Sequence, residues 1–131
     1  MRDGLINYFS SFIKMKEITK YLLEIATNIK RSPKEILDYY LLESVLCRVS
    51  HSIYASELVL RGGMLTRLWI PPERRIAEDV DFLGLYPYDI ELTGEKFIDI
   101  FKNTNTNLTD EVIFNLDSLE VKGIWLETEY P

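Results

Sequence analysis

The chain has 131 residues, of which 47% are hydrophobic and 27% are charged, and its formal net charge is −6. This much apolar material supports a folded core and excludes global disorder, and the length suits one domain. The acidic balance argues against a broad basic surface for nucleic acid. A local basic group remains, formed by Arg61, Arg67, Arg74 and Arg75.

The chain has one cysteine, Cys47, so no internal disulfide can form and a reducing compartment is expected. Cys47 falls in an apolar helical pattern, which favours an inert buried thiol. No apolar run approaches the roughly 18 residues of a membrane span. The first residues lack the pattern of a signal peptide. We therefore expect a cytoplasmic protein without a membrane partner.

The first fifty residues are predicted to be helical. Apolar residues recur at helical spacing over residues 5–29. Ser32, Pro33 and Glu35 then form the pattern of a capped helix start, with a capping box between Ser32 and Glu35. The helix that follows should end near residues 48–51, with His51 near its C-terminus. We predict an N-terminal helical part over residues 1–52 and a second part over residues 53–131.

The pattern changes after residue 57. Residues 58–60 form a short apolar run, predicted to be a buried strand, and Gly62 and Gly63 end it. A short helix is expected over residues 64–69. Residues 75–83 alternate, so that Asp79 and Asp81 share one face of a strand. Further on we expect a helix at 94–102 and strands at 111–116 and 120–127, joined by a turn at 117–118.

The two aspartates point to metal chemistry. Two like charges close together repel, and a cation between them relieves the repulsion. Mg²⁺ prefers such oxygen ligands and is often shared with substrate phosphates. Gly62 and Gly63 lack Cβ atoms, so their backbone could approach a phosphate closely. Taken singly, the aspartate pair fits a solvated strand face and the glycine pair a plain turn. Their combination is more specific.

Strand, Gly-Gly, short helix, and a strand with two aspartates form the core of the nucleotidyltransferases with a polymerase-β-like fold. Residues 43–52, 59–63, 65–69 and 75–82 resemble motifs of the AbiEii/AbiGii-type nucleotidyltransferase toxins, and the resemblance covers about residues 35–131. It implies an α+β fold, a minimal nucleotidyltransferase core with a small mixed sheet behind the N-terminal helical part.

The resemblance also implies an activity, the transfer of a nucleotidyl group from a nucleoside triphosphate to an acceptor, in some members transfer RNA, in a toxin–antitoxin or phage-defence setting. Asp79 and Asp81 would be catalytic and bind Mg²⁺ or Mn²⁺. A cognate antitoxin and a homodimer are the further partners considered. The nucleotide-binding positions would be Gly62, Gly63, Met64, Arg67 and Arg75.

Three departures from the family pattern leave an alternative open. Met64 and Ala77 stand where the family often has Ser or Thr. The segment carrying a third catalytic carboxylate and the C-terminal half are not found, which leaves Glu120, Glu127 and Glu129 as late acidic candidates. The alternative function is therefore a truncated, non-catalytic remnant that binds a protein partner.

Other residues are given structural roles: Tyr39, Tyr40 and Trp69 in a core or interface, and Lys96, Lys102 and Lys122 in solvent.

Overall fold

The computed structural model describes residues 16–71, 76–104, 110 and 112–123. Within these residues the fold is α+β, as predicted. Its elements are the helices α2 (Lys16–Asn28), α3 (Pro33–Ser50), α4 (Gly63–Thr66) and α5 (Ile90–Thr104), the strands β1 (Leu58–Arg61) and β2 (Asp81–Gly84), and the 3₁₀ helix η1 (Leu116–Ser118). No helix in the described part is both long and apolar enough to cross a membrane.

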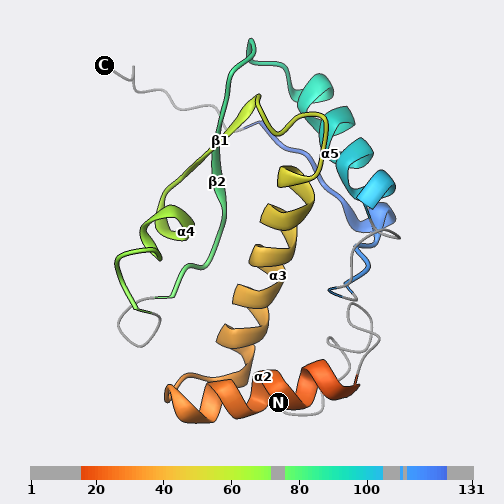
Figure 1. Ribbon diagram of the computed structural model, residues 1–131. Coiled ribbons are helices and arrows are strands. Elements are labelled where there is room, and N and C mark those ends of the chain that lie inside the picture. The colour runs from red at the N-terminus through yellow and green to blue at the C-terminus, as the bar shows by residue number, and fades with distance from the viewer. Residues whose placement is uncertain (1–15, 72–75, 105–109, 111, 124–131) are drawn as a thin grey trace.

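Helix α3 is the central element (Figure 1). It begins as the sequence predicts, because the Ser32 hydroxyl accepts a hydrogen bond from the Glu35 N–H while Glu35 accepts one from the Ser32 N–H. This capping box satisfies two backbone donors that have no partner inside the helix. The helix ends at Ser50, and His51 is its C-cap, which confirms both predictions.

The sheet consists of β1 and β2 alone within the described residues, paired antiparallel. The predicted mixed sheet is not seen in this part of the chain, where the sheet is purely antiparallel. The strands are also shorter than expected, since pairing runs only from Leu58 opposite Gly84 to Arg61 opposite Asp81. Beyond Arg61 the chain turns at Gly62, so residues 76–80 lie past the end of β1 and form no strand.

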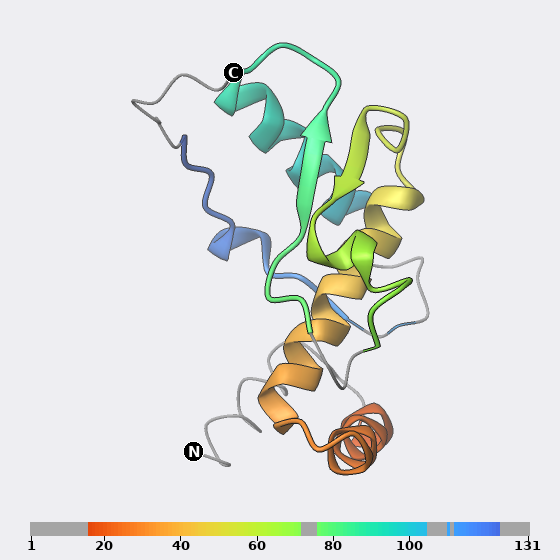
Figure 2. The ribbon, with the colours of Figure 1, turned by 90° about the vertical axis from the view of Figure 1, so that its left-hand side faces the viewer.

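One face of the sheet packs against the long helices (Figure 2). Leu58 joins a buried cluster with Val49 of α3 and Ile100 of α5. The strand neighbour Val59 points the other way and is 43% exposed, so β1 is only half-buried rather than buried as predicted. Short strands of this kind need a helical layer for stability, and α3 and α5 supply it.

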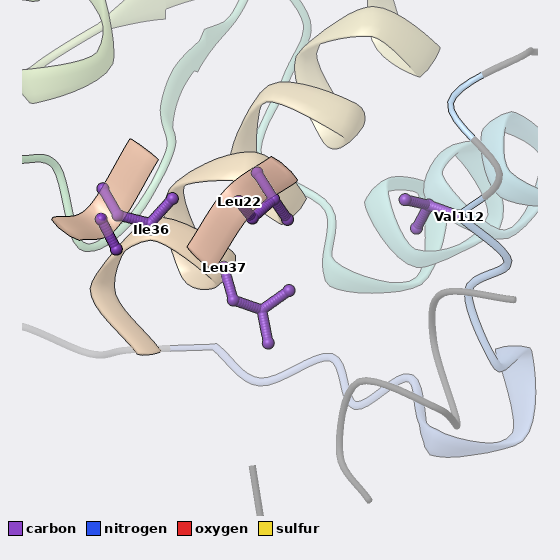
Figure 3. Close-up of a cluster of buried hydrophobic side chains, with 5 residues drawn as sticks. Leu22, Ile36, Leu37 and Val112 are labelled. Carbon is purple, nitrogen blue, oxygen red and sulfur yellow. The ribbon is translucent and has the colours of Figure 1, made fainter. Parts of the chain in front are cut away.

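A second buried cluster joins α2 to α3. Leu22 of α2 packs with Ile36 and Leu37 of α3, and Val112 from the segment after α5 belongs to the same cluster (Figure 3). The helical spacing of the apolar residues in α2 predicted this contact face. Residues 5–15 of the predicted first helix lie outside the described residues.

The last part of the described chain differs most from the prediction. Residues 113–115 and 119–123 form no strand, Val112 forms a single β-bridge, and η1 occupies the predicted turn. Residue 111 and residues 124–127 of the two predicted strands lie outside the described residues. The physical reason lies in Asn115, whose side chain accepts a hydrogen bond from the Asp117 N–H and whose carbonyl accepts from Ser118. Helix α5 begins at Ile90 rather than at 94, because Asp89 accepts a hydrogen bond from the Leu92 N–H.

Several single-residue predictions also need correction. Lys96 is 8% exposed rather than solvated, because it pairs with Glu57 and lies against the rings of Tyr54 and Tyr86, 4.9 and 4.4 Å from their centroids. Cys47 is half-buried rather than buried. Trp69, expected in a core or interface, is 72% exposed and is not a core residue, while its place in an interface stays a prediction.

Three further assignments of this kind are confirmed. Lys102 and Lys122 are exposed, as expected. Tyr40 packs against the buried cluster of α2 and α3, and its hydroxyl donates to the Asp110 carbonyl oxygen at 2.7 Å. The division of the chain at residues 52 and 53 stays a prediction.

Candidate functional site

Gly62 begins the candidate site. It follows β1 directly and has φ +71° and ψ −152°, a region that is essentially restricted to glycine. Among the described residues it is the one glycine with positive φ. Its carbonyl accepts hydrogen bonds from the Leu65 and Thr66 N–H groups at 3.1 Å, which starts the single turn of α4. The glycine therefore converts a strand into a helical turn within one residue.

The space beside Gly62 is occupied by Asp81. A Cβ atom on Gly62 would lie 2.5 Å from the Asp81 Oδ2 atom, closer than any real contact allows. The strand register explains this proximity, because Arg61 pairs with Asp81 and Gly62 is the next residue. The sheet thus brings the glycine turn into direct contact with Asp81, one of the two aspartates.

An open pocket of about 500 Å³ lies at this junction. Asp79 and Asp81 both line it, together with Gly62 and Gly63. The expected strand does not hold the two aspartates, since only Asp81 lies in β2 and Asp79 lies in the preceding bend. Three further residues complete the walls of what we call the acidic pocket: Ile76, Ala77 and Glu78.

Glu78 and Ile76 were not among the predicted site residues. The signal for Glu78 was its position directly before Asp79, which gives three carboxylates within four residues. Nothing in the sequence marked Ile76 as a site residue, because an apolar residue in an alternating pattern is expected in the core. Both become visible only once the chain between α4 and β2 is placed beside Gly62.

The other predicted nucleotide-binding residues lie elsewhere. The Met64 side chain is 1% exposed and belongs to the core, so only its backbone could face a phosphate. Arg67 is the C-cap of α4, and its Nη1 atom is 2.6 Å from Oε1 of Glu43 on α3. Arg75 lies outside the described residues. Arg61 is exposed and pairs with Asp81 in the strand register, so the two residues share one face of the sheet.

The donor atoms of the acidic pocket suit a hard divalent cation. Mg²⁺ is commonly bound through one or two carboxylates, with water and substrate phosphates completing its shell. Asp79 and Asp81 match this set, and the bare backbone of Gly62 lies against one of them. Within the described residues no group of three His, Cys, Asp or Glu side chains is arranged to hold a metal ion.

The candidates for a third carboxylate stay apart from the pocket or outside the described residues. Glu120 is exposed, 2.9 Å from Lys122, and lines a different hollow beside Phe101 and η1. Glu127 and Glu129 lie outside the described residues. His51 is the C-cap of α3, and its Nδ1 atom is 2.7 Å from the Cys47 carbonyl oxygen, consistent with the structural role predicted for it.

A second set of polar residues fixes the scaffold rather than the pocket. Arg48 is fully buried in α3, and its guanidinium donates to both carboxylate oxygens of Asp110, at 2.6 and 3.1 Å. It also donates to the Val112 carbonyl oxygen and lies 5.0 Å from the centre of the Phe114 ring. Partial burial raises the pKa of Asp110, but the hydrogen bonds from Arg48 and the Val112 N–H outweigh it and hold that pKa below its ordinary value.

An acidic pair against a glycine turn defines a pocket suited to a divalent cation and a polyphosphate. A comparison with known protein families agrees with this chemistry. Residues 44–126, more than half of the chain, match the model of the nucleotidyl transferase AbiEii toxin family of type IV toxin–antitoxin systems. The chain belongs to this family. No curated protein and no solved structure gave a match.

Proposed function

We propose that this chain transfers a nucleotidyl group from a nucleoside triphosphate to an acceptor hydroxyl, in a reaction that depends on Mg²⁺ or Mn²⁺. The observation that carries the proposal is the contact between the backbone of Gly62 and the carboxylate of Asp81 in one open pocket. Membership of the nucleotidyl transferase toxin family supports the same chemistry. The acceptor we propose is RNA, such as a transfer RNA, and the protein partner a cognate antitoxin.

The aspartates and glycines of the acidic pocket, and the arginines expected near it, have separate roles in this proposal. Asp79 and Asp81 would hold the metal, which when bound would offset phosphate charge and bind the reacting oxygens. Gly62 and Gly63 would let the triphosphate approach the backbone. Arg61, opposite Asp81, and Arg75 would offset further negative charge. Arg67 would act from α4, where its pair with Glu43 holds it in place.

The test is a transfer assay with RNA and nucleoside triphosphates labelled at the α-phosphate, with Mg²⁺ or Mn²⁺. Asp79→Asn and Asp81→Asn should each reduce transfer by about 100-fold or more, because each removes a charged metal ligand worth several kcal/mol. Asp117→Asn is the matched control, since it removes the same charge from an exposed position in η1. Full activity in either pocket variant would contradict the proposal.

A second candidate function is protein binding without catalysis. It is favoured by the outer face of the sheet, where Val59 and Leu83 lie opposite each other and are 43% and 45% exposed. In this case the cognate antitoxin would bind the wild-type chain and the Asp79→Asn/Asp81→Asn double variant equally, and neither would transfer nucleotide. A steep loss of antitoxin binding in the double variant would count against it.

A further inference from the structure

A second pocket, of about 480 Å³, lies between α2 and α3. Three tyrosines line it, Tyr21 from α2 and Tyr39 and Tyr40 from α3. Most other lining side chains are aliphatic, and among the described residues Glu43 is the one charged group in its wall. Pockets for small organic ligands have this size and this mostly apolar lining with a few polar groups. We call this the tyrosine pocket.

The tyrosine pocket adjoins the acidic pocket. Ile76 lines both of them, so this residue forms a shared wall. A second link crosses the same boundary: Glu43, in the wall of the tyrosine pocket, pairs at 2.6 Å with Arg67 at the end of α4, the helical turn that Gly62 starts. A ligand with a charged end and an apolar, flat end could therefore use both pockets.

We propose that the tyrosine pocket holds the nucleobase of the nucleotide whose phosphates enter the acidic pocket. This inference rests on the function proposed above and extends it to the base. A nucleobase is a flat ring with polar edges, and stacking on an aromatic side chain stabilises it without a strong sequence preference. The Glu43 carboxylate can accept hydrogen bonds from an amino group or ring N–H at the edge of the base.

Two of the three tyrosines are free of an evident packing role. Tyr40 packs on the buried cluster of α2 and α3 and binds the Asp110 carbonyl oxygen, which makes it part of the scaffold. Tyr21 and Tyr39 are neither buried nor among the partly buried residues that pack on this cluster. Tyr21 is 63% exposed, so its ring is accessible to a ligand. Their truncation should leave the fold intact.

The experiment compares two kinds of probe on the full chain with Mg²⁺: each of the four ribonucleoside triphosphates, and inorganic tripolyphosphate, which has no base. Affinities are measured by calorimetry for the wild type and for Tyr21→Ala/Tyr39→Ala. The variant should bind its best nucleotide about 10-fold or more weakly, because stacking surface is lost. Its affinity for tripolyphosphate should equal that of the wild type. Tyr88→Ala is the matched control, since Tyr88 is 77% exposed and lies in the loop before α5.

Each other outcome has a defined meaning. If the double variant binds nucleotide as tightly as the wild type, or if wild type binds tripolyphosphate as tightly as every nucleotide, the base does not use this pocket and the inference is wrong. The proposed function would still stand. If the wild type binds neither kind of probe, the proposed function fails, and the base pocket fails with it.

A measurement on the unmodified chain covers the case in which the variant does not fold. In NMR spectra of the wild type saturated with its best nucleotide, base protons should show intermolecular Overhauser effects to the ring protons of Tyr21 or Tyr39. Contacts of the base with other aromatic rings alone, such as Trp69, would overturn the inference. This second readout does not depend on catalytic activity.

Discussion

Gly62 meets two separate requirements at one position. Its backbone conformation lies in a region that other residues avoid, and the space where a Cβ would stand is taken by the Asp81 carboxylate. A turn alone would need only the first property. The second ties the glycine to the acidic pair, and it is the reason that we regard the two motifs as one site.

The first prediction concerns this residue. Gly62→Ala should lower the free energy of unfolding by about 2 kcal/mol or more, from backbone strain and the displaced carboxylate. Gly63→Ala is the matched control, because Gly63 has no positive φ and stands at the first position of α4. Its cost should stay below about 1 kcal/mol. Urea unfolding of the three proteins measures the difference, and equal losses would contradict this account.

Lys96 shows what a residue pattern leaves undecided. In sequence it stands in a predicted helix, and a lysine is ordinarily solvated. In the structure its ammonium group is enclosed by Glu57 and the rings of Tyr54 and Tyr86. Tyr54 in turn donates to Asp99, and this hydrogen bond to a carboxylate raises the pKa of Tyr54. The network joins α5 to the chain just before β1 and just after β2.

At the scale of elements, α3 is the part that local sequence defines best. Its start depends on Ser32, Pro33 and Glu35, which act within one turn of each other. The hydrogen bonds from the backbone and side chain of Ser32 lower the pKa of Glu35. Because every partner is local, the capping box was predictable without any knowledge of the tertiary fold.

The second prediction tests this cap. Ser32→Ala should destabilise the protein by about 1 kcal/mol, since a backbone donor of the first turn loses its acceptor. Ser50→Ala is the control at the other end of the same helix, where the hydroxyl donates to the Cys47 carbonyl oxygen and is exposed. Its effect should stay within about 0.5 kcal/mol. Thermal unfolding followed by circular dichroism compares them.

At the scale of the whole molecule, Arg48 and Asp110 join α3 to the segment that follows α5. The pair lies 62 residues apart in sequence, with the guanidinium fully buried. Removing one partner of such a pair leaves a buried charge without its counterion, which typically costs about 3–5 kcal/mol. Arg48 belongs to the motif that resembles the family, and its role here is to hold the scaffold together.

The third prediction follows from this pair. Asp110→Asn should lower the free energy of unfolding by about 3 kcal/mol near neutral pH. The asparagine keeps an oxygen that can accept a hydrogen bond, but it lacks the negative charge that pairs with Arg48. The pKa of Asp110 is lower in the folded chain than its ordinary value of 3.8. Its contribution is therefore complete above that value and is lost as pH falls through the folded pKa.

The measurement is urea unfolding of wild type and Asp110→Asn from neutral to acidic pH. The stability difference between them should be constant near neutrality and shrink as the pH falls below about 4. Asp117→Asn, the exposed control, should show little difference at any pH. If the difference in unfolding free energy stays unchanged in acid, the charge of Asp110 is not the cause of that difference.

The sequence by itself determined the features that depend on neighbours along the chain. The capping box of α3, the contact face of α2 and the strand ended by Gly62 all follow from residues within a few positions of each other. The motifs of the site, Gly62-Gly63 and Asp79 with Asp81, were also recognisable, together with the family. Local hydrogen bonding and side-chain periodicity act over this range, so no tertiary information was needed.

Tertiary structure alone decided where these parts meet. The register of β1 and β2 sets Asp81 against Gly62, ends the strand before Asp79 and turns Val59 toward solvent. Packing between α2, α3 and Ile76 creates the tyrosine pocket, and the partners of Lys96 and Arg48 come from distant segments. Such contacts depend on how far the strands pair and on how the helices pack. Patterns along the sequence do not specify which distant segments come together.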